Sequence, residues 1–292
     1  MAIAAFSSCT ELGVPFFYLN IDTSVADIWQ PDEKGSFSSR RPEKVTMTLR
    51  ADKLAAYLAG HGFEVESMDL KRTEMNEQEQ QFLSRALIGN MSDGIAALNH
   101  AATAARGSPD LTSDDVQATP ALNVILDSLV ENGWVKILPA LDKKTDIRIR
   151  FCDENTRSFL NGRWLEDYAG MVLHQCLPPN TQVANVRVRN DRSGRPNELD
   201  ILFIQGHSLH VVEVKTLRWN DDDNSKQDTI HKLLSLKGQL GGLTAKGCLV
   251  SYQKLTSDVR SRALAANIFV IEGAALHPES NFKGKFKEWL RQ

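Results

Sequence analysis

The chain has 292 residues, of which 42% are hydrophobic and 24% are charged, as in an ordinary globular protein with room for two domains. Its apolar runs are too short to cross a bilayer, and no basic-then-apolar leader opens it, which excludes a membrane span and a secretory leader. The net charge of −3 gives no overall attraction to nucleic acid, so a polyanion would need a local patch or a metal. The four cysteines are scattered without a CxxC pair, which is typical of a reduced cytoplasmic protein.

The N-terminal part predicts mixed α/β structure. The opening segment favours a helix that ends at Gly13, and residues 14–21 favour an aromatic-rich strand. Residues 53–65 predict a helix followed by a strand. Between them, residues 30–44 carry turn-forming residues and predict a loop.

The middle of the chain predicts helices. Residues 76–90 and 92–107 are candidate helices, and a polar loop is expected over 107–120. A third helix is indicated by four apolar residues at the spacing of one helical face, with Gly133 as its terminator. These residues are Leu122, Ile125, Leu126 and Leu129. Residues 134–138 and 146–151 then predict a hairpin. A helix followed by a hairpin resembles the order of a winged-helix element.

The C-terminal part predicts alternating helices and strands. The expected order is helix (155–177), strand (181–190), hairpin (198–216), helix (226–245), strand (247–252), helix (257–267), strand (268–273) and a terminal helix. Both strands of the hairpin are apolar enough to be buried, yet they carry four charged residues. These charges are the main functional feature of the sequence.

A turn over residues 205–208 places Asp200 opposite Glu213 and Glu198 opposite Lys215. Period-2 alternation then gathers these four side chains at one end of one face. A slip of one residue would separate them. The opposite face is predicted to contain Leu199, Ile201, Phe203, Val212 and Val214.

Two carboxylates at the end of a buried sheet repel each other unless they share a cation. A hard divalent ion with oxygen ligands removes this conflict, and Lys215 could orient a water or stabilise charge on a phosphate. Glu166, on the preceding helix, is a further candidate ligand because its face is made of small residues. The alternative is that the Glu-x-Lys pattern forms a solvated edge and that Glu166 is simply exposed.

An Asp followed about a dozen residues later by Glu-x-Lys, on a hairpin between helices, resembles the PD-(D/E)XK nuclease superfamily. The resemblance implies its αβββαβ core and a Mg²⁺ or Mn²⁺ cofactor. It implies that Asp200 and Glu213 are metal ligands and that Lys215 is the catalytic lysine. Glu166 matches the acid often found on the first helix, and Glu198 is an additional candidate ligand. Leu199 stands where the family name places a proline.

The segments NGRWLEDY, NELDILFI, LHVVEVKT and GQLGGLTAKGCLVS look like the nuclease half of CRISPR-associated effectors. Those proteins join a Rossmann-like CARF domain, which binds cyclic oligoadenylate, to this nuclease and act as homodimers in antiviral defence. The resemblance implies a partial CARF-like region over 1–72, a helical linker over 73–152 and a PD-(D/E)XK domain over 153–292. It also makes Lys232 and Gln239 secondary site candidates.

The N-terminal segment departs from the CARF pattern. It resembles the second half of such a domain, and the Thr/Gly-rich loop that approaches the cyclic nucleotide would precede it. Because the chain starts at Met1, control by cyclic oligoadenylate is in doubt. A truncated product, a wrongly assigned start and a variant without its sensor all fit the sequence.

Basic residues on either side of the hairpin are candidate phosphate contacts, which position a nucleic acid without reading its sequence. They are Arg187, Arg189, Arg192, Arg195, Arg218, Lys226, Lys232 and Lys237, with Trp219 as a possible stacking residue. DNA and RNA are equally compatible with them. The competing hypotheses are a metal-dependent nuclease, a non-catalytic nucleic-acid-binding module and an inactive fragment.

Overall fold

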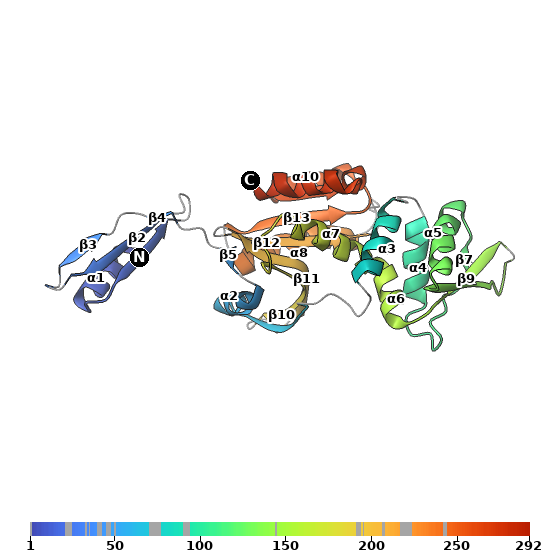
Figure 1. The fold of residues 1–292 in the computed structure, drawn as a ribbon, viewed down its shortest axis with the longest axis horizontal. Coiled ribbons are helices and arrows are strands. Elements are labelled where there is room, and N and C mark those ends of the chain that lie inside the picture. Colours follow the sequence, from blue (N-terminus) through green and yellow to red (C-terminus); the bar gives the residue numbers. More distant parts are fainter. Residues whose placement is uncertain are drawn as a thin grey trace.

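The computed structural model groups its elements along one long axis (Figure 1). A small sheet with α1 lies at one end, a large mixed sheet lies in the middle, and a group of helices lies at the other end. The structure describes residues 2–20, 25–32, 34, 36–39, 43–44, 48–49, 51–69, 77–89, 94–143, 145–190, 194, 196–205, 208–216, 224–241 and 244–292.

The N-terminal elements form an antiparallel sheet beside one helix. As predicted, the helix α1 (Ala2–Glu11) is followed by Gly13, whose φ of 64° suits a residue without a side chain. The strands are β1 (Phe16–Asn20), β2 (Val25–Pro31), β3 (Phe37–Ser39) and β4 (Glu43–Lys44). Strand β2 pairs antiparallel with each of the other three.

The strands of this region pair antiparallel, because the four residues 21–24 between β1 and β2 are too few for a parallel crossover. The expectation of a loop over 30–44 is wrong, since that segment contains β3. The Asp32 carboxylate accepts backbone N–H bonds from Lys34 and Ser36, at 2.9 and 2.8 Å, and so closes a turn that pairs β2 with β3.

The large sheet has seven strands in the order β14-β13-β12-β11-β10-β6, with β5 paired to β11. Its strands are β5 (Thr48–Leu49), β6 (Phe63–Asp69), β10 (Gln182–Asn190), β11 (Pro196–Gln205), β12 (Ser208–Lys215), β13 (Lys246–Ser251) and β14 (Ile268–Glu272). The last three are parallel and the others antiparallel. The predicted domain boundary at residue 72 therefore lies after β5 and β6, which both belong to this sheet. Their partners, β11 and β10, lie far along the chain, so local sequence does not reveal the pairing.

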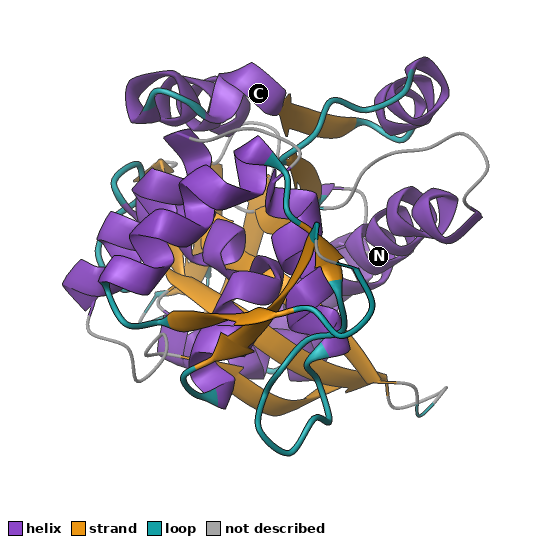
Figure 2. Cartoon of the chain, turned by 90° about the vertical axis from the view of Figure 1, so that its right-hand side faces the viewer, coloured by secondary structure: helices purple, strands orange, loops and turns teal. Residues whose placement is uncertain are grey.

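Helices cover both faces of this sheet, as Figure 2 shows. Side chains of α7 and α10 share one buried cluster with Val212 and Val214, whereas those of α2, α8 and α9 share another with Leu209 and Val211. The helical elements here are η1 (Ala51–Lys53), α2 (Leu54–Gly60), α6 (Glu154–Ser158), the π-helical turn η2 (Phe159–Arg163), α7 (Trp164–His174), α8 (Asn224–Gly241), α9 (Ser257–Ala265), η4 (Gly273–Leu276) and α10 (Glu279–Leu290). The order from α6 to β13 is the predicted helix, three strands, helix and strand.

The middle of the chain contains α3 (Glu77–Gly89), α4 (Gly94–Ala104), β7 (Val116–Gln117), α5 (Pro120–Glu131), β8 (Val135–Pro139) and β9 (Asp146–Phe151). The strands form a small sheet in the order β7-β9-β8. The Thr119 hydroxyl accepts the Leu122 N–H at 3.2 Å and caps α5, and all four residues of its predicted apolar face are buried. This order is compatible with the winged-helix-like interpretation.

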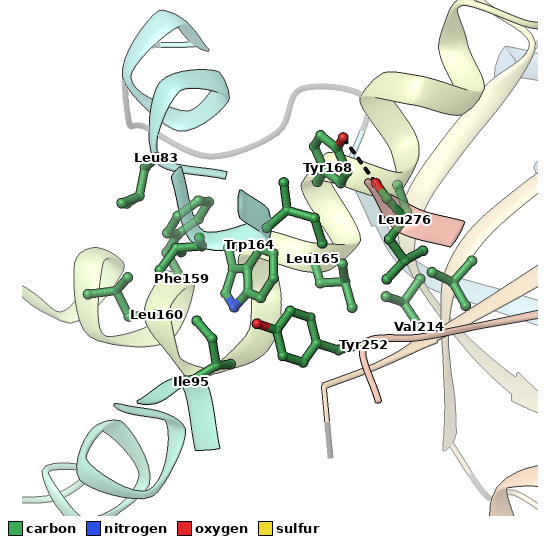
Figure 3. Close-up of a cluster of buried hydrophobic side chains, with 14 of the residues drawn as sticks. Leu83, Ile95, Phe159, Leu160, Trp164, Leu165, Tyr168, Val214, Tyr252 and Leu276 are labelled. Carbon is green, nitrogen blue, oxygen red and sulfur yellow. Dashed lines mark hydrogen bonds between the residues drawn. The ribbon is translucent and has the colours of Figure 1, made fainter. Parts of the chain in front are cut away.

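One buried cluster joins these helices to the large sheet (Figure 3). Ile95 of α4 lies in it with Trp164 and with Tyr252, whose rings meet edge to face with their centroids 5.5 Å apart. All four cysteines are free thiols. In the described part of the chain, no helix is both long enough and apolar enough to cross a membrane.

Candidate active site

The β11–β12 hairpin has the predicted register. Ile204 pairs with Leu209, and the antiparallel ladder continues as far as the pair Ile201 and Val212. At the next step the two strands no longer share a ladder hydrogen bond. The Val214 N–H donates instead to the Asp200 carboxylate, at 2.6 Å. The hairpin therefore opens where its charged residues begin, and a side chain takes the place of a strand partner.

The pairing of β11 with its other neighbour, β10, is also interrupted at Asp200. The register between β10 and β11 omits the pair Asn185 and Asp200, and Asn185 has a φ of 48°. Asn tolerates this left-handed conformation better than most residues do. Leu199 consequently packs in the cluster of Leu202, and not in that of Ile201. Strict alternation, which placed Leu199 on the Ile201 face, is wrong here because the irregularity reverses the facing of the strand.

Two lysines approach one buried carboxylate. The side chain of Glu213 is 2% exposed, and Lys215 Nζ lies 2.7 Å from its Oε1 atom. Lys232, on the helix α8 that follows the hairpin, places its Nζ 3.6 Å from the same oxygen. The sequence assigned Lys232 to a secondary role, whereas the structure brings it into direct contact with the acidic group. Only the packing of α8 on β12 could reveal this.

Glu166 enters the group from α7. A π-helical turn precedes this helix, with Gly162 at a φ of 103°, and the small residues Gly162, Ala169 and Gly170 are buried as expected for a closely packed face. Burial raises the pKa of Glu166 well above its usual value, the charge of Asp200 raises it further, and Lys215 offsets part of the rise. Glu166 is therefore an electrostatic neighbour of the hairpin residues.

The remaining charges show the same conflict between burial and repulsion. Burial raises the pKa of Asp200 to about 7, the charge of Glu213 adds to this rise, and Lys215 opposes it. Burial alone would lower the pKa of the Lys215 ammonium. The carboxylates of Asp200 and Glu213 outweigh that effect and raise it. The carboxylates of Asp200, Glu213 and Glu166 and the ammonium groups of Lys215 and Lys232 thus form one charged cluster at the open end of the hairpin.

Glu198 enters the site differently from the prediction. The ladder between β11 and β12 ends before the expected pair of Glu198 and Lys215. The Glu198 residue is exposed, and its backbone carbonyl accepts a hydrogen bond from Lys232 Nζ at 3.1 Å. Its strand partner on β10 is Arg187. Glu198 thus helps to place Lys232.

The predicted phosphate contacts have three different environments. Arg187 and Arg189, with side chains 60% and 50% exposed, both pair with Glu66 of β6. Gln239 bonds to Ser235 and Asn190 on the surface. Lys237 donates to the backbone carbonyls of Ala266 and Asn267 next to the end of α9, so it has a structural contact in this structure. Arg192, Arg195, Arg218, Trp219 and the side chain of Lys226 lie outside the described residues.

The donor set suits a hard divalent cation in type. Asp200, Glu213 and Glu166 offer carboxylate oxygens, and Glu213 Oε2 is buried without a hydrogen-bond partner among the described residues. As they stand, no three His, Cys, Asp or Glu side chains of those residues are arranged to hold an ion. The Val214 N–H and the Lys215 ammonium occupy two of the carboxylates instead. The residues thus fit a divalent cation by the type of their donor atoms, although the present arrangement pairs them with protein donors.

The C-terminal part of the chain is similar to a known class of nuclease domain. Residues 152–292 match the family model described as the Card1-like endonuclease domain. This segment contains Glu166, the charged hairpin and Lys232. The match supports nuclease activity in this part of the chain.

Two solved structures share the fold of the chain. The crystal structure of protein VC1899 from Vibrio cholerae is 24% identical, with a TM-score of 0.73, and the match covers 99% of this chain and 72% of that one. The structure of Can2 from Sulfobacillus thermosulfidooxidans in complex with cyclic tetra-adenylate is 23% identical, with a TM-score of 0.64, and the match covers 100% of this chain and 72% of that one. No curated protein matches the chain.

Proposed function

We propose that this protein is a metal-dependent PD-(D/E)XK nuclease that hydrolyses phosphodiester bonds of DNA or RNA in CRISPR-linked antiviral defence. One observation carries the proposal: Lys215 and Lys232 both approach one oxygen of the buried Glu213 carboxylate, whose charge also acts on Asp200. A fold needs no such concentration of poorly solvated charge. A phosphodiester-cleaving site requires acids for a cation and ammonium groups for a phosphate.

The roles follow from the chemistry of each group. Asp200 and Glu213, with Glu166, would hold Mg²⁺ or Mn²⁺, which polarises the phosphate and lowers the pKa of a bound water. Lys215 is charged and close to the acids, so it would orient that water or stabilise the developing phosphate charge. Lys232 has a side chain that is 38% exposed, so it would be a second ammonium contact for the phosphate. Arg187 and Arg189 would position the strand beyond it.

The non-catalytic binding module finds less support. Its contacts would come from the winged-helix-like middle, whose central helix α5 exposes the carboxylates of Asp127 and Glu131. The same helix exposes Val124 and Val130, at 56% and 42%. This acidic and apolar surface of α5 is a poor contact for a polyanion. Around the charged hairpin, Arg187, Arg189 and Lys232 have side chains that are 60%, 50% and 38% exposed.

A cleavage assay tests the proposal. Plasmid, single-stranded DNA and RNA would be incubated with the purified protein in Mn²⁺, Mg²⁺ or EDTA, with and without cyclic tetra-adenylate, the ligand in the Can2 structure. We expect metal-dependent cleavage that is lost in Glu213→Gln and retained in Glu288→Gln, a surface acid paired with Lys285. Binding without cleavage by folded wild type would overturn the nuclease. Light scattering of the same samples tests the expected homodimer.

A further inference from the structure

The end of β12 is held by side chains as well as by strand partners. On one side the parallel strand β13 continues to Ser251 opposite Lys215, and the Tyr252 N–H donates to the Lys215 carbonyl at 2.8 Å. The ladder with β11 stops at Val212. Beyond it, the Asp200 carboxylate bonds to Val214. The next described attachment is at Thr216, directly after the candidate catalytic lysine.

That attachment comes from outside the matched endonuclease segment. Asn99, on α4, donates its Nδ2 hydrogen to the Thr216 hydroxyl at 3.0 Å. The hydroxyl also lies against the π-helical turn, because a Cβ atom at Gly162 would stand 2.7 Å from it. Four residues after Gly162, the chain reaches Glu166. Thr216 is therefore the point where α4, the π-helical turn before α7 and the end of β12 meet.

Helix α4 is firmly seated at this junction. Figure 3 shows Ile95, one helical turn before Asn99, in the buried cluster with Leu160 of the π-helical turn and with Tyr252. One turn after Asn99, the Thr103 hydroxyl donates to Asn161 at 2.9 Å. The helix thus contacts both segments that carry site residues. Asn99 Oδ1 is buried and has no hydrogen-bond partner among the described residues. Burying this oxygen away from water costs free energy, which the fold tolerates at this position.

We propose that Asn99 is a positioning residue, which fixes Thr216 and through it the ammonium of Lys215. The inference rests on the proposed nuclease function. It makes the helical middle of the chain part of the working site, although the matched domain begins only at residue 152. A small displacement of a catalytic group lowers turnover far more than it lowers substrate binding. The Asn99–Thr216 bond is therefore a site through which the rest of the chain can alter cleavage.

Four single variants and one double variant test this role by kinetics. Asn99→Ala and Thr216→Val should each reduce kcat by about tenfold or more with KM nearly unchanged, and the double variant should lose little more than either one. Thr216→Ser keeps the hydroxyl and should restore most of kcat. Asn132→Ala, which removes an exposed Asn side-chain bond to Ser128 in the same region, should leave kcat unchanged. Circular dichroism and thermal melting would confirm that each variant is folded.

A second readout does not require cleavage. The rate at which an amine-reactive ester acylates the neutral amine form of Lys215, followed by peptide mass spectrometry, should rise about threefold or more in Asn99→Ala and Thr216→Val, because a lysine displaced from Glu213 is more accessible to the ester. Wild-type kcat and wild-type acylation in both variants would overturn the positioning role, as would a Thr216→Ser variant as slow as Thr216→Val. Cleavage by wild type with unchanged variants refutes only this inference. An inactive wild type whose Lys215 still responds to Asn99→Ala refutes the nuclease and leaves the positioning role standing.

Discussion

Glu213 and Lys215 stand two residues apart on β12, and the Lys215 ammonium lies 2.7 Å from a Glu213 oxygen whose side chain is 2% exposed. Neither charge is well solvated, so each depends on the other for its stability in the folded protein. The same arrangement that suits a phosphodiester-cleaving site also makes the resting site sensitive to the loss of one partner. This relationship gives the first prediction.

Lys215→Met should abolish cleavage and also destabilise the fold, by about 3 kcal/mol, because it leaves a buried carboxylate without its nearest cation. Adding Glu213→Gln to this variant should restore much of the lost stability without restoring cleavage. Urea unfolding of the two single variants and the double variant measures the coupling between the residues. Additive effects of the two substitutions would contradict the proposed mutual dependence.

Metal binding should strengthen with pH. Burial, followed by the charge of Glu213, raises the pKa of Asp200 to about 7, so most Asp200 is protonated at pH 6 and ionised at pH 8. A cation binds the ionised form and must displace the proton below pH 7. Mg²⁺ affinity measured by calorimetry should therefore rise between pH 6 and pH 8, with proton release at the lower pH. Asp200→Asn should bind more weakly and with a smaller pH dependence, because the pKa of Glu166 is also raised by burial. Equal wild-type affinity at both values would contradict the prediction.

Glu66→Gln should increase affinity for nucleic acid. Glu66 pairs with Arg187 at 3.3 Å and also with Arg189, so it competes with phosphate for both guanidinium groups. Because all three side chains are partly exposed, we expect about a threefold tightening at low salt and a steeper salt dependence. Fluorescence anisotropy with a labelled oligonucleotide, in EDTA, measures this effect.

Two comparisons make the Glu66 experiment specific. Glu131→Gln removes the same charge from the exposed surface of α5 and should change affinity much less. Replacing both Arg187 and Arg189 by Ala should cancel the gain from Glu66→Gln. If the gain persists without the two arginines, Glu66 acts only through net charge, and the arginines are not phosphate contacts.

His210 should make the fold sensitive to acid. It is 1% exposed, stacks on Phe203, and lies edge to face with Trp289. Burial lowers its pKa from 6.5 to about 4, so the unfolded chain binds the proton more readily. Its contribution to stability is therefore full above pH 6.5 and falls by up to about 3 kcal/mol as the pH drops towards 4.

The pH effect of His210 is best measured against a variant. Asp200 titrates in an overlapping range with the opposite sign, because its raised pKa makes the folded state bind the proton more readily. The difference between wild type and His210→Phe cancels that contribution, and Phe preserves the aromatic packing. The unfolding free energy of His210→Phe relative to wild type should rise between pH 7 and pH 5. A constant difference would show that His210 does not titrate in this way.

Local patterns predicted most of the individual elements. The four apolar residues of α5 and the terminating Gly133 act within a few turns of one another, and the structure confirms that helix. The hairpin register was also predictable, because a short connection fixes which residues stand opposite each other. The antiparallel N-terminal sheet was missed, although the short link between β1 and β2 excludes a parallel crossover.

The sequence by itself determined the order of helices and strands from α6 to β13, and it placed Asp200, Glu213 and Lys215 near one another on the hairpin. These features depend on neighbours close in the chain. Tertiary structure alone decided that Lys232 meets Glu213 and that Asn99 holds Thr216. It also decided the irregularity that turns Leu199 away from Ile201. Each of these depends on how separate elements pack, and side-chain periodicity within one element carries no information about that packing.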